Sequence, residues 1–117
     1  MDKAELQNRT KQFALRVIKL TQALPKTPAG EVLGKQLLRA ATSVAANYRS
    51  ACRGRSKAEF IAKTGIVLEE CDESQLWLEL IVDSGLLPSR RVADLLKEAD
   101  ELTAIFVASL RTARGDR

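Results

Sequence analysis

The chain has 117 residues, a formal net charge of +4 and 45% hydrophobic residues. This length suits one domain with one core, and charged residues interrupt every apolar run before the roughly 20 residues that a membrane-spanning helix needs. Aromatic residues make up only 4%, which favours helices packed through aliphatic side chains over a β-sandwich. We therefore expect a single all-α domain over residues 1–117, with no contact with a membrane.

Apolar residues at helical spacing predict two helices in the first half of the chain. The first ends at Pro25, and the second begins after Thr27 as a cap and Pro28 in the first turn, and ends near Gly54. The expected core stripe of the first helix is Leu6, Phe13, Val17, Leu20 and Leu24, and that of the second is Leu33, Leu37, Ala40, Val44, Tyr48 and Ala51.

A capping box formed by Ser56 and Glu59 predicts the start of a third helix, which ends at Gly85. A fourth helix follows Pro88 and is expected to fray from Thr112 to the end of the chain. The predicted stripes are Phe60, Thr64, Val67, Cys71, Ser74, Leu78 and Ile81, then Val92, Leu95, Ala99, Leu102, Phe106 and Leu110. Short connections between these helices predict an up-down-up-down antiparallel four-helix bundle.

Three glycines lie inside the predicted helices, namely Gly30, Gly34 and Gly65. Each lowers helix propensity by about 1 kcal/mol relative to alanine. We expect close backbone contact to compensate for this loss at all three positions.

Charge is sorted along the chain. Residues 26–58 hold seven basic residues and one acid, whereas residues 59–84 hold seven acids and one lysine. One interpretation is that neighbouring helices attract each other. The other is an exposed basic patch for phosphate, formed by Arg49, Arg53, Arg55 and Lys57, with Tyr48 as a stacking surface. The same four cations are also typical of a solvated helix end that complements the helix dipole.

Arg39 lies on a polar stripe of the second helix. If the second and third helices are antiparallel and the chain turns near Arg55, the numbers of facing residues sum to about 110. Arg39 is therefore predicted to form a structural, partly buried ion pair with Glu70 or Glu73. The same register places Cys52 and Cys71 about 20 Å apart, beyond disulfide reach. With no CxxC spacing and no signal-peptide pattern at the N-terminus, a cytoplasmic location is expected.

The sequence contains no histidine. A di-iron site built from Glu-x-x-His motifs is therefore not expected, and no defined loop supports a hard cation such as magnesium. No cysteine has a histidine base and no phosphate loop is present, so we predict no catalytic residues, no cofactor and no enzymatic activity. Trp77 lies off the main apolar stripe of its helix, which predicts an interface with another subunit.

The chain resembles the S23 family, the four-helix-bundle proteins encoded in intervening sequences of bacterial 23S ribosomal RNA genes. The resemblance rests on Leu24 and Pro25, then Arg39, Ala40, Ala41, Ser43 and Asn47, then Arg53, Arg55 and Ser56, then Phe60. Where many members continue with a glutamate-glycine pair, this chain has Ser50 and Ala51, so no role of that pair is transferred.

This resemblance implies an up-down bundle that assembles as a ring, typically a pentamer, with no established enzymatic activity. The similar accessory protein of diversity-generating retroelements binds nucleic acid and a reverse transcriptase. Two hypotheses follow. The first is a non-enzymatic oligomeric bundle that contacts RNA or DNA through the basic patch. The alternative is a protein–protein assembly or adaptor module without nucleic-acid contact.

Overall fold

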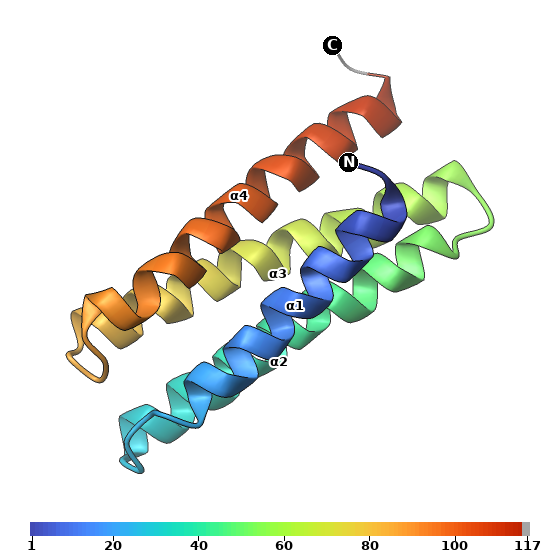
Figure 1. Ribbon diagram of the computed structural model, residues 1–117. Helices are drawn as coiled ribbons and strands as arrows, with labels where there is room; N and C mark the ends of the chain where they lie inside the picture. Colours follow the sequence, from blue (N-terminus) through green and yellow to red (C-terminus); the bar gives the residue numbers. More distant parts are fainter. Residues whose placement is uncertain (116–117) are drawn as a thin grey trace.

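The computed structural model describes residues 1–115 and contains four helices (Figure 1). They are α1 (Lys3–Thr21), α2 (Pro28–Cys52), α3 (Lys57–Asp83) and α4 (Ser89–Arg114). No strand occurs among these residues. The predicted all-α, up-down-up-down bundle is confirmed.

The helices are arranged around the bundle in chain order. Helix α2 packs against α1 and α3, and α3 packs against α4, whereas α1 and α4 touch only lightly. The α1–α4 seam is therefore the weakest side of the bundle. Within residues 1–115, no helix combines the length and apolar character needed to cross a bilayer.

Helix boundaries follow local chemistry. Helix α1 ends at Thr21 and not at Pro25 as predicted, because the chain tightens before the proline: the amides of Ala23 and Leu24 donate to the carbonyls of Leu20 and Thr21, three residues back. Pro25 in turn disfavours helical geometry in Leu24. The Ser56 hydroxyl accepts the Glu59 amide at 3.1 Å, and the Glu59 carboxylate accepts the amide of Arg55 at 2.6 Å. In the predicted capping box the Glu59 carboxylate would accept from the amide of the N-cap residue Ser56, whereas here it accepts from the residue before it, Arg55.

The C-terminal ends of α3 and α4 agree only in part with the predictions from the sequence. Gly85 adopts the left-handed conformation, with φ +77°, as its predicted role requires. The predicted fraying from Thr112 is wrong for the part of the tail that the structure describes, since α4 continues to Arg114 and Gly115 caps it in the left-handed conformation. Residues 116–117 lie outside the described residues.

One hydrophobic core runs through the four helices and is lined by the predicted stripes. All six predicted positions of α4 are buried, and so are the α3 positions apart from Phe60, which is half-buried. Tyr48 packs in this core against Phe106, with the two rings tilted by 56° and their centroids 5.2 Å apart. Thr64 and Ser74 are buried as their predicted stripe requires, and Thr10 and Glu70 are buried although they lie outside the predicted stripes.

The three helical glycines differ in their surroundings. A Cβ atom on Gly30 would lie 2.1 Å from the Pro25 carbonyl oxygen, and one on Gly34 would lie 3.1 Å from a methyl of Leu24. These two glycines let α2 pack closely against Leu24 and Pro25 in the connection that precedes it. Nothing lies within 4 Å of a Cβ on Gly65, so the expected close contact is wrong there.

Both cysteines are free thiols in the structure. Cys71 is fully buried in the core, whereas Cys52 is half-buried near the end of α2. Burial raises the pKa of the Cys71 thiol to about 12. The nearby carboxylates of Glu70 and Asp72 act in the same direction. The Cys71 thiol is therefore an unreactive core group at neutral pH.

Candidate nucleic-acid interface

The antiparallel topology gathers four helix termini at one end of the bundle. The N-termini of α1 and α3 lie there with the C-termini of α2 and α4 (Figure 1). We call this the basic end and define it by Lys3, Arg53, Arg55, Lys57 and Lys63. The last turn of α4 brings Arg111 and Arg114 to the same end.

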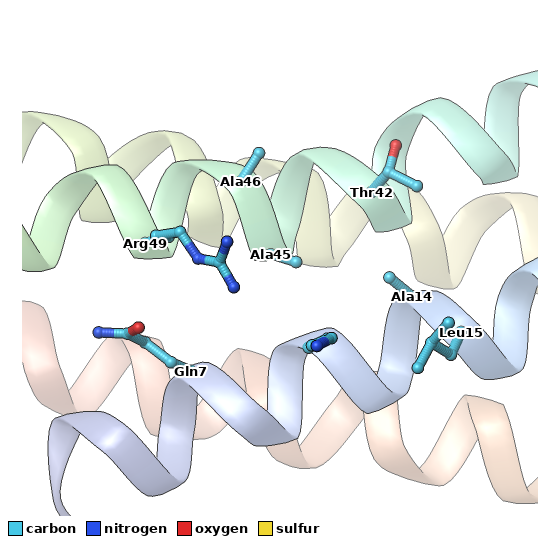
Figure 2. Close-up of a pocket in the computed structure, with 8 residues that line it drawn as sticks. Gln7, Ala14, Leu15, Thr42, Ala45, Ala46 and Arg49 are labelled. Carbon is cyan, nitrogen blue, oxygen red and sulfur yellow. The ribbon is translucent and has the colours of Figure 1, made fainter.

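The four predicted patch residues do not line one common surface. Arg53 and Arg55 line a hollow of about 470 Å³ together with Lys63 of α3. Lys57 lines a neighbouring hollow with Arg55 and Lys3 of α1. Arg49 lies on another side, in the groove between α1 and α2, where its guanidinium extends toward α1 (Figure 2). The structure thus keeps three of the four together, around the α2–α3 turn.

These cations are exposed and available to an anion. Arg49, Arg53, Arg55 and Lys57 are all exposed, and none takes part in an ion pair within residues 1–115. Glu59 lies in the same hollow, where its carboxylate accepts the backbone amide of Arg55. The arginine side chains are therefore free to donate forked hydrogen bonds to phosphate oxygens.

Aromatic stacking is not offered at this end. Tyr48, considered as a stacking surface from the sequence, is only 3% exposed and packs inside the core. Its burial raises the pKa of the hydroxyl, which stays neutral at physiological pH. Phe60 is half-buried, with Lys3 Nζ 4.8 Å from its ring centroid. The site is suited to phosphates and not to bases.

Arg39 contacts both carboxylates that the sequence proposed for it. Its Nη1 lies 2.9 Å from Glu70 Oε2, and its Nη2 lies 2.9 Å from Glu73 Oε1. The Glu70 side chain is 9% exposed, whereas those of Glu73 and Arg39 are 41% and 50% exposed. One cation therefore joins α2 to a buried and a surface carboxylate of α3.

The two carboxylates have opposite pKa shifts. Burial alone would raise the pKa of Glu70, but the side chains of Glu73 and Ser43, together with the charge of Arg39, outweigh it and lower this pKa. The proximity of Glu70 raises the pKa of Glu73. Because one arginine cannot neutralise two carboxylates, the more exposed Glu73 is the one that takes up a proton first.

Charge sorting between α2 and α3 yields little direct pairing. Across this seam, the ion pairs formed by residues 1–115 are those of Arg39 with Glu70 and Glu73. The cations of the basic end remain unpaired, so attraction between neighbouring helices accounts for only part of the pattern.

Trp77 is half-buried and packs against the core of its own chain. Its indole Nε1 is buried without a hydrogen-bond partner among the described residues. The side chain is thus only partly exposed in the single chain, and its place in a subunit interface stays a prediction. Among residues 1–115, the exposed large apolar side chains lie elsewhere, at Met1 and on α1, α2 and α3.

Sequence reasoning missed parts of the site that come from other helices. Lys3 and Lys63 join the basic end only because α1 and α3 begin there. The register that pairs Arg39 with Glu70 also brings Lys63 near the end of α2, so a signal for Lys63 was present. Within residues 1–115, no group of His, Cys, Asp or Glu side chains is arranged to hold a metal ion.

Comparison with known proteins decides the family. Residues 2–108 match the family model of the 23S rRNA-intervening sequence protein. The chain belongs to the 23S rRNA-intervening sequence protein family. No curated protein matches this family member.

The fold of this intervening-sequence family member is also similar to that of a solved structure. The crystal structure of a protein with unknown function from the S23 ribosomal protein family of Bacteroides thetaiotaomicron VPI-5482 is 28% identical, with a TM-score of 0.84. The match covers 90% of this chain and 97% of that one. The two folds therefore agree over almost the whole bundle.

Proposed function

We propose that this protein is a non-enzymatic, oligomeric helical bundle that contacts RNA or DNA through its basic end. The observation that carries the proposal is the group of exposed, unpaired cations around the α2–α3 turn. Helix α1 adds Lys3 at the same end of the bundle, and helix α4 adds Arg111 and Arg114. A concentration of unneutralised positive charge on one end of a rod favours a polyanion as ligand.

The contact is one of charge with the phosphate backbone. Arg53 and Arg55 supply forked donors to phosphate oxygens, and Lys57 and Lys63 supply point charges beside them. No exposed aromatic side chain is available at this end to stack on bases, so binding depends on the backbone and not on sequence. The affinity should fall steeply as salt releases the condensed counterions.

Self-association belongs to the same proposal. The resemblance to the S23 family supports a ring, typically a pentamer, and a ring multiplies the number of basic ends that one nucleic acid can meet, which raises avidity. The likeness to the accessory protein of diversity-generating retroelements supports nucleic acid as the partner. We infer a cytoplasmic setting, where the two unpaired thiols remain reduced.

The test is a titration of a structured RNA, followed by fluorescence anisotropy at several salt concentrations. We expect binding at low salt, with an affinity that decreases linearly with salt on a double-logarithmic plot. Replacing Arg53 and Arg55 with glutamine should weaken binding and make that slope shallower by about 1.5 to 2. Arg49→Gln should weaken binding less, because Arg49 lies in the groove between α1 and α2.

The matched control is the pair Arg90→Gln and Arg91→Gln. Both arginines are exposed at the start of α4, at the opposite end of the bundle. They change the net charge by the same amount and should leave binding nearly unchanged. Absence of RNA binding at low salt, or equal losses in the two double variants, would contradict the proposal and favour an assembly or adaptor module that binds only protein.

A further inference from the structure

Large apolar side chains are exposed on three of the four helices. Within the described residues of the helices they are Leu15 and Ile18 on α1, Val32 on α2, and Ile66, Leu76 and Leu80 on α3. Helix α4 has none. Leu15 and Ile18 are three residues apart and Leu76 and Leu80 are four apart, so each pair forms a continuous patch on its helix. Two separate faces, one on α1 and one on α3, each carry such a pair.

The first face is the groove between α1 and α2. It has a volume of about 470 Å³ and a floor of small side chains, Ala14, Ala45 and Ala46, with Leu15 at its edge (Figure 2). Lys11 and Arg49 also line it. The groove therefore combines an apolar floor with positive charge.

The second face is the outer side of α3, with Leu76 and Leu80 exposed by 48% and 38%. The exposed acids Glu69, Asp72 and Glu79 surround these two leucines, and residues 69–83 contain no lysine or arginine. This face therefore combines an apolar ridge with negative charge. It is the chemical complement of the groove.

We propose that the α1–α2 groove of one copy receives the outer face of α3 from a second copy of the same chain. This inference rests on the self-association stated in the proposed function and assigns the two faces that form the contact. Leu76 and Leu80 would cover the alanine floor, while Lys11 and Arg49 would meet the acids beside them. Both components of recognition, apolar burial and opposite charge, favour the same pairing.

Pairing each face with its own copy is disfavoured by charge. Two grooves brought together would place Lys11 and Arg49 against identical cations, and two α3 faces would oppose identical acids. Joining the two different faces removes both repulsions. Such a contact is head-to-tail, so each chain uses one groove and one α3 face, and successive copies form a closed ring or an open filament.

The experiment uses one variant for each face, examined by size-exclusion chromatography with light scattering. Leu15→Glu places an acid in the groove, and Leu76→Lys places a base on the α3 face. The wild-type protein should form a particle of several chains, and each variant alone should run at the 12.9 kDa mass of the single chain. An equimolar mixture should regain at least twice that mass, because the intact groove of one variant fits the intact α3 face of the other.

Ala104→Lys on the exposed side of α4 is the matched control and should keep the wild-type mass. Circular dichroism verifies the fold of each variant, and Ile18→Glu or Leu80→Lys replaces any variant that fails to fold. A wild-type protein that stays at single-chain mass overturns the inference. So does either variant that keeps the wild-type mass, or a mixture that stays at single-chain mass.

RNA anisotropy on the same samples separates this inference from the proposed function. The Leu15→Glu chain keeps its basic end, so it should still bind RNA at low salt, with lower avidity. RNA binding without assembly contradicts the self-association and the docking inference that rests on it, and leaves the nucleic-acid contact standing. Assembly without RNA binding contradicts the nucleic-acid contact alone.

Discussion

At the residue scale, Arg39 holds together two carboxylates that differ in depth. Glu70 is buried and Glu73 lies at the surface, and both receive a hydrogen bond of 2.9 Å from the same guanidinium. A buried carboxylate without its cation would be strongly unfavourable, which makes Arg39 necessary for a helix pair that contains Glu70. The cluster explains how a charged residue occupies a core position of α3.

The first prediction concerns the pH dependence of this cluster. The pKa of Glu70 is lowered in the folded state, so its contribution to stability is present above its ordinary pKa and is lost as the pH falls through the lower folded value. We expect Glu70→Gln to reduce the free energy of unfolding by about 1–3 kcal/mol near neutral pH and by much less near pH 3. Urea unfolding at both pH values measures this difference.

Glu73→Gln is the comparison for that measurement. The pKa of Glu73 is raised by Glu70, so its contribution is present below its ordinary pKa and is lost as the pH rises through the higher folded value. The variant should therefore show the opposite pH trend to Glu70→Gln, with a smaller effect because the side chain is half-exposed. The same pH trend in both variants would show that the two carboxylates are not coupled as described.

At the element scale, α2 and α3 each contain a glycine whose substitution has a predictable sign. Gly30→Ala would place a Cβ 2.1 Å from the Pro25 carbonyl oxygen, so the backbone would have to shift, at a cost of about 1–3 kcal/mol. Gly65→Ala meets no atom within 4 Å and improves helix propensity, so we expect a gain of about 0.5–1 kcal/mol. Urea midpoints of the two variants give both values.

The two variants control each other because they make the same chemical change inside a helix. If Gly30→Ala stabilised the protein as Gly65→Ala is expected to, the close approach of α2 to Pro25 would not exist in solution.

The signals that predict where each helix begins and ends are local in the sequence. Thr27, Ser56 and Gly85 act at helix ends as their residue types predict.

At the scale of the whole molecule, the lightly packed α1–α4 seam contains a two-bond ion pair. Arg9 Nε lies 2.8 Å from Glu98 Oε2 and Nη2 lies 2.6 Å from Oε1, while Glu101 is 3.7 Å away. The Glu98 side chain is 13% exposed. Paired hydrogen bonds of this kind fix orientation as well as contributing energy. The ion pair therefore aligns the first helix with the last.

We expect Glu98→Gln to reduce the free energy of unfolding by about 1–3 kcal/mol and to speed amide exchange in α1 more than in α2 and α3. The reason is that α1 contacts α4 only lightly apart from this pair. Hydrogen exchange followed by mass spectrometry detects the change. Glu101→Gln is the control and should have little effect, because its longer contact with Arg9 is at the surface. Equal exchange in both variants would contradict this role for Glu98.

The helices, their order and most of the core could be predicted from the amino-acid sequence, because helix periodicity and end signals are local properties. The stripe of α4 is an example, with Val92 through Leu110 buried at every predicted position. The Arg39 contacts with Glu70 and Glu73 also followed, since a short connection sets the register of an antiparallel pair. The cations around the α2–α3 turn could be predicted as well, because they are close neighbours in the sequence.

The way in which residues from separate helices combine became visible only in the folded bundle. The fold separated Arg49 from Arg53 and Arg55, added Lys3 and Lys63, and withdrew Tyr48 into the core. It also showed that Gly65 has open space and that Arg9 meets Glu98 across the α1–α4 seam. These features depend on the rotation of each helix about its axis, which is set by the packing of all four helices together and not by the pattern of any one of them.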